Sequence, residues 1–222
     1  MHKVTWSHSG LKDFESCARK YHEIKVLKNY PREETTATMY GTKLHEQAEL
    51  YVRDGRPLDA DFKFLEPTLK ALVAQPGEKL CELEMALTVD LEVCDFKAKD
   101  VWVRGIADIV IIDHDNKTAR VFDYKSGGDK YPDTSQLELM ALMLFKHYPY
   151  IDKVSAGLLF VLRGTVARCS INKDSAEALW WKYRQRVARI EKAFAVNVWH
   201  PSQSGLCKKY CAVLTCEFNG RN

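Results

Sequence analysis

Three charged residues near the middle of the chain have the types and spacing that a hydrolytic metal site needs. Asp108 interrupts the apolar run from Ile106 to Ile112, and Asp123 stands two positions before Lys125. Alternate residues of a strand point to the same face, so Asp123 and Lys125 would share one space. A buried charge costs several kcal/mol unless it is paired or holds a metal. The two acids and the lysine therefore form a candidate metal site.

The chemistry that this set would support is phosphodiester hydrolysis, which needs a hydroxide near the phosphorus and positive charge around a pentacovalent transition state. Asp108 and Asp123 supply hard oxygen ligands of the kind that Mg²⁺ and Mn²⁺ prefer, and Lys125 supplies a cation. His45 would add a nitrogen ligand, which somewhat favours Mn²⁺. Glu84, on the polar face of the preceding strand, would complete the acidic cluster.

The elements expected to position these residues form an α/β domain with a mixed central sheet. Two apolar runs around the turn 113–116 predict a β-hairpin within 101–127. The other expected strands cover 79–93, 154–162 and 165–171. The expected helices, chosen from capping residues and apolar stripes, cover 10–27, 42–53, 61–74, 135–147 and 174–198.

Composition places the chain among ordinary globular proteins, since 222 residues with 46% hydrophobic and 28% charged side chains suit one domain over 1–222. No apolar run approaches the roughly 20 residues of a membrane helix. The first ten residues lack an apolar signal core, so we expect a cytoplasmic protein of a bacterium or a phage-infected host. The net charge of +3 permits a nucleic-acid partner without requiring one.

Several short motifs carry a family resemblance. Residues 105–108 (GIAD) followed by 123–125 (DYK) resemble the core of the PD-(D/E)XK nucleases. Residues 41–46 (GTKLHE) are similar to the histidine motif of the RecB-like branch of that superfamily. Gln136 matches the first residue of the branch's Gln-x-x-x-Tyr motif, although Met140 stands at the tyrosine position.

The resemblance covers nearly the whole chain and implies a restriction-endonuclease-like core, with a central mixed β-sheet flanked by helices. The implied ligands of Mg²⁺ or Mn²⁺ are His45, Asp108, Asp123 and the carbonyl oxygen of Tyr124. The implied catalytic and supporting residues are Lys125, Asp108, Asp123, Glu84 and Gln136. The alternative interpretations are a solvated Asp-x-Lys pair, an ordinary helix-edge histidine at His45 and a solvent-facing Glu84.

A cluster of cysteines near the end of the sequence suggests a second metal site. Its members are Cys207, Cys211 and Cys216. A tetrahedral metal or a [4Fe–4S] cluster wants a fourth ligand, and Cys17 would supply it, joining 1–30 to 199–222 as a cysteine-bound subregion. This arrangement resembles the iron–sulfur subset of RecB-like nucleases, which includes CRISPR-associated adaptation nucleases. Zinc and free thiols are the alternatives.

Basic residues in the last helix and the tail are candidate phosphate contacts. They are Arg184, Arg189, Lys208 and Lys209. A solvated helix face is the alternative for the first two.

Taken together, the motifs favour a metal-dependent deoxyribonuclease. The resemblance implies an exonuclease that acts on single-stranded or end-bearing DNA, in phage or bacterial recombination, repair or spacer processing. The main alternative is a non-catalytic nucleic-acid-binding or assembly module with a structural iron–sulfur or zinc site. An iron–sulfur redox protein is a weaker third hypothesis, because nothing else in the sequence indicates a second redox centre.

Overall fold

The computed structural model describes residues 4–31 and 35–220, which divide into two compact units. Unit 1 combines Met1–Glu34 with Trp181–Asn222, and unit 2 is Thr35–Trp180. Both halves of the predicted cysteine subregion fall in unit 1. That a metal cluster joins them stays a prediction, as does the assignment of one domain to the whole chain. Within the described residues, no helix is both long enough and apolar enough to cross a membrane.

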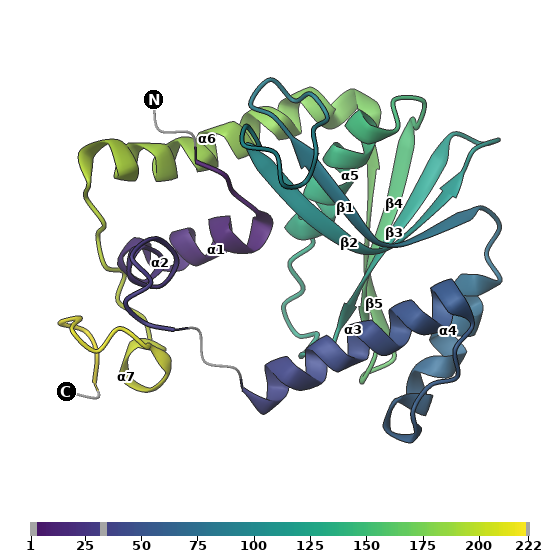
Figure 1. Ribbon diagram of the computed structural model, residues 1–222, viewed down its shortest axis with the longest axis horizontal. Helices are drawn as coiled ribbons and strands as arrows, with labels where there is room; N and C mark the ends of the chain where they lie inside the picture. The colour runs from purple at the N-terminus through teal and green to yellow at the C-terminus, as the bar shows by residue number, and fades with distance from the viewer. Residues whose placement is uncertain (1–3, 32–34, 221–222) are drawn as a thin grey trace. The chain divides into compact units, whose positions relative to one another are not determined.

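Unit 2 is built on a five-stranded sheet whose order follows the sequence, β1-β2-β3-β4-β5 (Figure 1). The strands are β1 (Glu78–Leu87), β2 (Val103–Asp113), β3 (Thr118–Lys125), β4 (Lys153–Phe160) and β5 (Thr165–Asn172). Neighbours are antiparallel except β3 and β4, which are parallel. A parallel pair needs a crossover connection, and helix α5 (Ser135–His147) provides it.

Helices cover both faces of this sheet (Figure 1). On one face lie α3 (Thr36–Asp54), a 3₁₀ segment (Ala60–Leu65) and α4 (Glu66–Val73). Their apolar side chains form a core with those of β2 and β3, which includes Leu44, Leu69, Ile109, Ile111 and Tyr124.

On the other face, α5 is buried almost throughout. Met140 packs so closely against β2 that a Cβ at Gly105 would lie 2.5 Å from its Cε. The predicted fold class, a mixed sheet flanked by helices in a restriction-endonuclease-like core, is confirmed.

Helix α3 begins earlier than the sequence pattern indicated. Thr35 caps it in a reciprocal capping box with Thr38, so Gly41 and Thr42 lie inside the helix and do not start it. Glycine weakens a helix interior by about 1 kcal/mol. A Cβ at Gly41 would lie 3.6 Å from Ser126 Oγ, an ordinary van der Waals distance, so α3 passes close to the end of β3 with room for a small side chain.

Unit 1 begins with a helix that is interrupted where a continuous one was expected over 10–27. It consists of α1 (His8–Ser16), α2 (Ala18–Tyr21) and a π-helical turn (His22–Val26). Between α1 and α2, Cys17 is extended (φ −163°), and its Sγ accepts a hydrogen bond from Lys20 N at 3.5 Å. The interruption turns Cys17 from a helical side chain into an N-cap.

The rest of unit 1 comes from the C-terminal part of the chain. A 3₁₀ turn (Lys173–Ser175) in unit 2 leads into α6 (Ala176–Val196), which continues into unit 1, and α7 (Cys207–Tyr210) follows. Arg186 on α6 makes a bidentate pair with Glu15 on α1, with N–O distances of 2.7 and 2.8 Å. Arg186 is therefore committed to packing. Arg184 and Arg189 on the same helix are exposed.

Candidate active site

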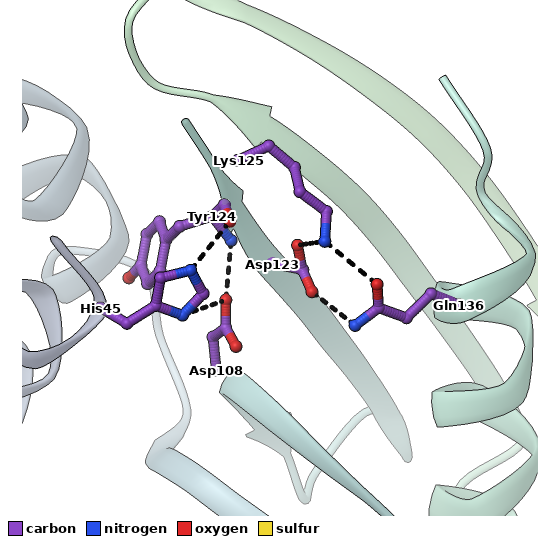
Figure 2. A network of polar contacts seen from close by, with 6 residues as sticks. All are labelled: His45, Asp108, Asp123, Tyr124, Lys125 and Gln136. Carbon is purple, nitrogen blue, oxygen red and sulfur yellow. Dashed lines mark hydrogen bonds and ion pairs between the residues drawn. The ribbon is translucent and has the colours of Figure 1, made fainter. Parts of the chain in front are cut away.

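Polar side chains from four elements converge where β3 ends (Figure 2). The last three residues of β3 are Asp123, Tyr124 and Lys125. Beside them lie Asp108 of β2, His45 of α3 and Gln136 in the first turn of α5. All belong to unit 2. They form two adjoining groups, one around His45 and one around Lys125.

The first group links His45, Asp108 and the backbone of Tyr124. His45 Nδ1 lies 3.2 Å from Asp108 Oδ2, and His45 Nε2 lies 3.1 Å from the Tyr124 carbonyl oxygen. The same Asp108 oxygen accepts a hydrogen bond from Tyr124 N at 2.8 Å. Asp108 is only 9% exposed, so the predicted buried charge is real and is held by these polar partners. Both His45 nitrogens face oxygen acceptors.

Glu82 on β1 joins this group, and sequence reasoning missed it. Single ligand atoms of His45, Glu82 and Asp108 all lie within 4.8 Å of one another. The β1–β2 ladder pairs Cys81 with Ile109 and Leu83 with Ala107, so Glu82 stands opposite Asp108. Its backbone is left-handed (φ 48°), a conformation that is costly for a residue with a side chain.

Glu84, the predicted acidic partner, lies elsewhere. It is exposed and lines a separate hollow with Asp95, Phe96, Lys97 and Ala98. Glu82 and Glu84 are two apart in β1, but Glu82 stands opposite the buried Asp108, whereas Glu84 pairs with the exposed Ile106. No sequence signal separates the two glutamates. Which glutamate faces Asp108 depends on the β1–β2 register. The connection between these strands, residues 88–102, is too long for the sequence pattern to predict that register.

The second group links Asp123, Lys125 and Gln136. Lys125 Nζ lies 2.7 Å from Asp123 Oδ2 and donates a hydrogen bond to Gln136 Oε1 at 3.1 Å. Gln136 Nε2 donates to the other oxygen of Asp123 at 2.7 Å. The amide of Gln136 therefore bridges the acid and the lysine and orients both (Figure 2). Asp123 is 5% exposed, whereas the Lys125 side chain is 35% exposed and can reach a bound substrate.

The carboxylates of the site crowd one another, and their pKa values record this. Burial, followed by the charge of Asp108, raises the pKa of Glu82 to about 7. The same two causes raise the pKa of Asp123, although Lys125 opposes them. Glu82 and Asp123 thus resist ionisation beside Asp108.

The His45 imidazole responds in the opposite sense. Burial by itself disfavours the His45 cation, but the hydrogen bond and charge of Asp108 outweigh it, and the pKa of His45 is raised. The acidic cluster thus attracts positive charge, as a cation-binding site must.

The donor set fits a divalent cation. Two carboxylates and an imidazole within 4.8 Å of one another suit Mn²⁺ or Mg²⁺, and the Tyr124 carbonyl oxygen, 3.1 Å from His45, is a further hard donor. Bound there, the ion would activate water and neutralise charge on a phosphate. Lys125 lies in the adjoining group as a second positive charge, and Gln136 keeps it in place.

The four predicted cluster cysteines all lie in unit 1 and line one pocket of about 60 Å³. All seven cysteines of the chain are free of disulfides. Two sulfurs already accept backbone hydrogen bonds, Cys17 Sγ from Ser202 N at 3.4 Å and Cys207 Sγ from Ser204 N at 3.3 Å. Both sulfurs therefore lie against the backbone of residues 202–204.

The predicted phosphate contacts are also in unit 1, and all are exposed. They are Arg184 and Arg189 on α6 and Lys208 and Lys209 on α7. Their contact with nucleic acid remains a prediction.

Comparison with known proteins identifies the class. The family model of the PD-(D/E)XK nuclease superfamily matches residues 5–216, so the chain belongs to that superfamily and is a nuclease. Nucleic acid is therefore its substrate class. A comparison with curated protein sequences gave no match.

A solved structure with a TM-score above 0.5 supports the fold. A protein from Eubacterium rectale that carries the provisional name of an exonuclease is 14% identical, with a TM-score of 0.54 over 93% of this chain and 86% of that one. The structure of SSO0001 is 18% identical, with a TM-score of 0.48 over 98% of this chain and 87% of that one.

Proposed function

We propose that this nuclease is a divalent-metal-dependent deoxyribonuclease of the RecB-like branch, acting as an exonuclease on single-stranded or end-bearing DNA. The observation that carries the proposal is that a candidate cation site lies beside a positively charged side chain. His45, Glu82 and Asp108 form the candidate cation site. The partly exposed Lys125 adjoins it and is held by Asp123 and Gln136.

Two residues in the site support the RecB-like assignment. His45 contacts Asp108, and Gln136 contacts both Asp123 and Lys125. These are the residues by which the sequence resembles that branch. The buried Met140 at the motif's tyrosine position packs on Gly105 and serves the core.

In the proposed reaction the site residues divide the work. Asp108 and His45 would hold Mn²⁺ or Mg²⁺ together with Glu82, and the two further ligands that the sequence predicts, Asp123 and the Tyr124 carbonyl oxygen, would assist. Lys125 would donate to a phosphate oxygen and stabilise the charge that develops during hydrolysis. Asp123 and Gln136 would keep the Lys125 ammonium aimed at that position.

The test is cleavage of end-labelled linear and of circular single-stranded DNA, with duplex DNA and RNA as further substrates, in Mg²⁺ or Mn²⁺. We expect Lys125→Ala to lower kcat by about a hundredfold or more. Lys146→Ala, which removes an exposed lysine from the end of α5, serves as the matched control. Equal cleavage by Lys125→Ala would overturn the assignment of the site. Cleavage of circular DNA as fast as linear DNA would overturn the exonuclease assignment alone.

We also propose that Cys17, Cys207, Cys211 and Cys216 hold a [4Fe–4S] cluster that joins the two ends of the chain within unit 1. All four line one pocket, whose volume of about 60 Å³ is several times the 10–15 Å³ or so that a water molecule needs. Four thiolates around one zinc ion would close on it at about 2.3 Å, so the space favours a larger group.

The cluster is tested by iron and zinc content and by absorption near 400 nm after anaerobic purification. Cys17→Ser is expected to lose the iron and the absorption, whereas Cys94→Ser, outside the pocket, should keep both. An unchanged spectrum for Cys17→Ser would refute the four-cysteine assignment. Stoichiometric zinc without iron would decide for the zinc alternative.

A further inference from the structure

The segment between β3 and α5, residues 126–134, starts and ends in the candidate active site. We call it the β3–α5 loop. Lys125 immediately precedes it and Gln136 follows it closely, and their side chains are joined by a 3.1 Å hydrogen bond. A loop whose two ends are clamped together must project beside those ends.

A third anchor holds the middle of the β3–α5 loop at the same end of the sheet. Asp129 Oδ2 accepts a hydrogen bond from Thr165 Oγ1 at 2.7 Å. Thr165 pairs with Phe160 across β4 and β5, and Phe160 pairs with Lys125 across β3 and β4. Asp129 is therefore held by Thr165 at the same level of the sheet as Lys125.

Directly after this anchor the loop presents a tyrosine to solvent. Tyr131 is 83% exposed, the highest value among the exposed large apolar side chains of the described residues. Lys130 Nζ lies 5.3 Å from the centre of its ring. Pro132 restricts the backbone of Tyr131 to extended conformations, which lowers the entropy cost of using the ring as a contact.

We propose that Tyr131 is a substrate-positioning residue that stacks on an unpaired base of single-stranded nucleic acid, while Lys130 neutralises a neighbouring phosphate. This inference deepens the proposed nuclease function and rests on it. An extended chain advances at most about 3.5 Å per residue, so Tyr131 lies within about 18 Å of Gln136. The stacked base would accordingly be a few nucleotides from the phosphate at Lys125. An exposed phenol ring with an adjacent ammonium is the pair of groups that non-sequence-specific single-strand binding uses.

The first measurement is binding, so that it does not depend on cleavage. A fluorescent single-stranded oligonucleotide is titrated with protein carrying Lys125→Ala, alone or combined with a loop change. We expect Tyr131→Ala to weaken binding roughly 5- to 100-fold, the range that loss of one base stack produces. Tyr131→Phe, which keeps the ring, should bind as the parent does. Phe64→Ala, which removes a 40%-exposed ring from a different element, is the matched control and should have no effect.

The second measurement locates the base. Single abasic positions are walked along the oligonucleotide, and each is combined with Tyr131 or Tyr131→Ala. At the position of the stacked base, or at two adjacent positions, the abasic substitution and Tyr131→Ala together should lower the affinity no more than either change does separately. Additive losses at every position would overturn the proposal, and so would a Tyr131→Phe protein as weak as Tyr131→Ala.

The two proposals fail in different ways. If Tyr131 couples to a base but the protein with Lys125 intact cleaves nothing, the nuclease assignment of the site fails and the stacking proposal stands. If cleavage is normal and Tyr131→Ala changes neither Kd nor KM, the stacking proposal fails by itself.

Discussion

At the residue scale, the central finding is that Glu82 faces Asp108 and His45. A left-handed backbone at a glutamate is not adopted without cost, of order 1–3 kcal/mol, and here it accompanies a carboxylate placed against another carboxylate. Neither feature helps the fold by itself. A cation held by the two acids would offset both costs.

This placement predicts unequal effects for two nearby glutamates. Glu82→Gln should weaken Mn²⁺ binding about tenfold or more, because it removes a charged ligand, whereas Glu84→Gln should leave binding within twofold. Isothermal titration with Mn²⁺ measures both. The reverse order of effects would return the acidic role to Glu84.

The raised pKa values predict how metal binding depends on pH. Glu82, with a pKa of about 7, and His45, with a raised pKa, both carry protons in the metal-free protein at acidic pH. Because a metal must displace these protons, affinity for Mn²⁺ should rise steeply from about pH 5.5 to 7.5, with proton release on binding. Titration in buffers of different ionisation enthalpy measures the release. Glu82→Gln should release fewer protons, and a pH-independent affinity would contradict the prediction.

The same groups set the sign for stability without metal. An acid whose folded pKa lies above its unfolded value of about 4.5, as for Glu82, favours the fold at low pH and loses that contribution as pH rises toward 7. His45, a base with a raised folded pKa, loses its contribution in the same direction as pH rises through that value. The metal-free protein should therefore lose stability between about pH 5 and 8. Added metal should restore it.

At the element scale, β1 depends on a glycine that leads into it. Gly77 has φ +116°, and a Cβ there would lie 2.5 Å from the Ile112 carbonyl oxygen at the end of β2. Gly55, which ends α3 with φ +66°, has open space around the same position. Both glycines have a positive φ, but only Gly77 is also closely packed. Comparing the two therefore distinguishes the cost of the backbone conformation from the cost of a steric clash.

We predict that Gly77→Ala destabilises the protein by about 3 kcal/mol, because a backbone oxygen must move in addition to the strained φ. Gly55→Ala should lower the free energy of unfolding by only about 1 kcal/mol, because alanine is disfavoured in the left-handed conformation. Urea unfolding of both variants measures the difference. Equal losses would mean that β1 can shift away from Ile112.

At the scale of the whole molecule, the candidate active site belongs to unit 2, while the cysteine pocket and the predicted phosphate contacts belong to unit 1. Substitutions at the predicted phosphate contacts therefore leave every residue of the candidate active site unchanged. Unit 1 is tied together internally by Glu15 with Arg186 and by aromatic packing of Trp199 with Phe14, Tyr21 and Phe194.

Salt dependence tests the part that unit 1 plays in binding DNA. Each phosphate contact on single-stranded DNA contributes about 0.7 to the slope of log Kobs against log salt. Changing both Lys208 and Lys209 to Ala should lower that slope by about 1.4. The same change at Lys63 and Lys153, which are exposed in unit 2, should leave it unaltered. Identical slopes for the two double variants would remove α7 from the binding surface.

The sequence by itself predicted the sheet, the hairpin and most of the residues that converge at the candidate active site. Apolar alternation marks strands wherever one face is buried. A charge inside such a run, as at Asp108, is costly to bury, so it indicates a functional position. Asp123 and Lys125, two apart on β3, share a space as strand geometry requires, and Gln136 meets them because α5 follows so soon after.

Only the tertiary structure decided the features that depend on register and on local interruptions of regular backbone. Periodicity predicted one helix through Cys17, yet the chain is extended there. Periodicity also put Glu82 and Glu84 on one face, and only the β1–β2 register places Glu82 opposite Asp108. Both features involve residues distant in sequence, Ser202 beside Cys17 and Asp108 beside Glu82, which no local pattern encodes.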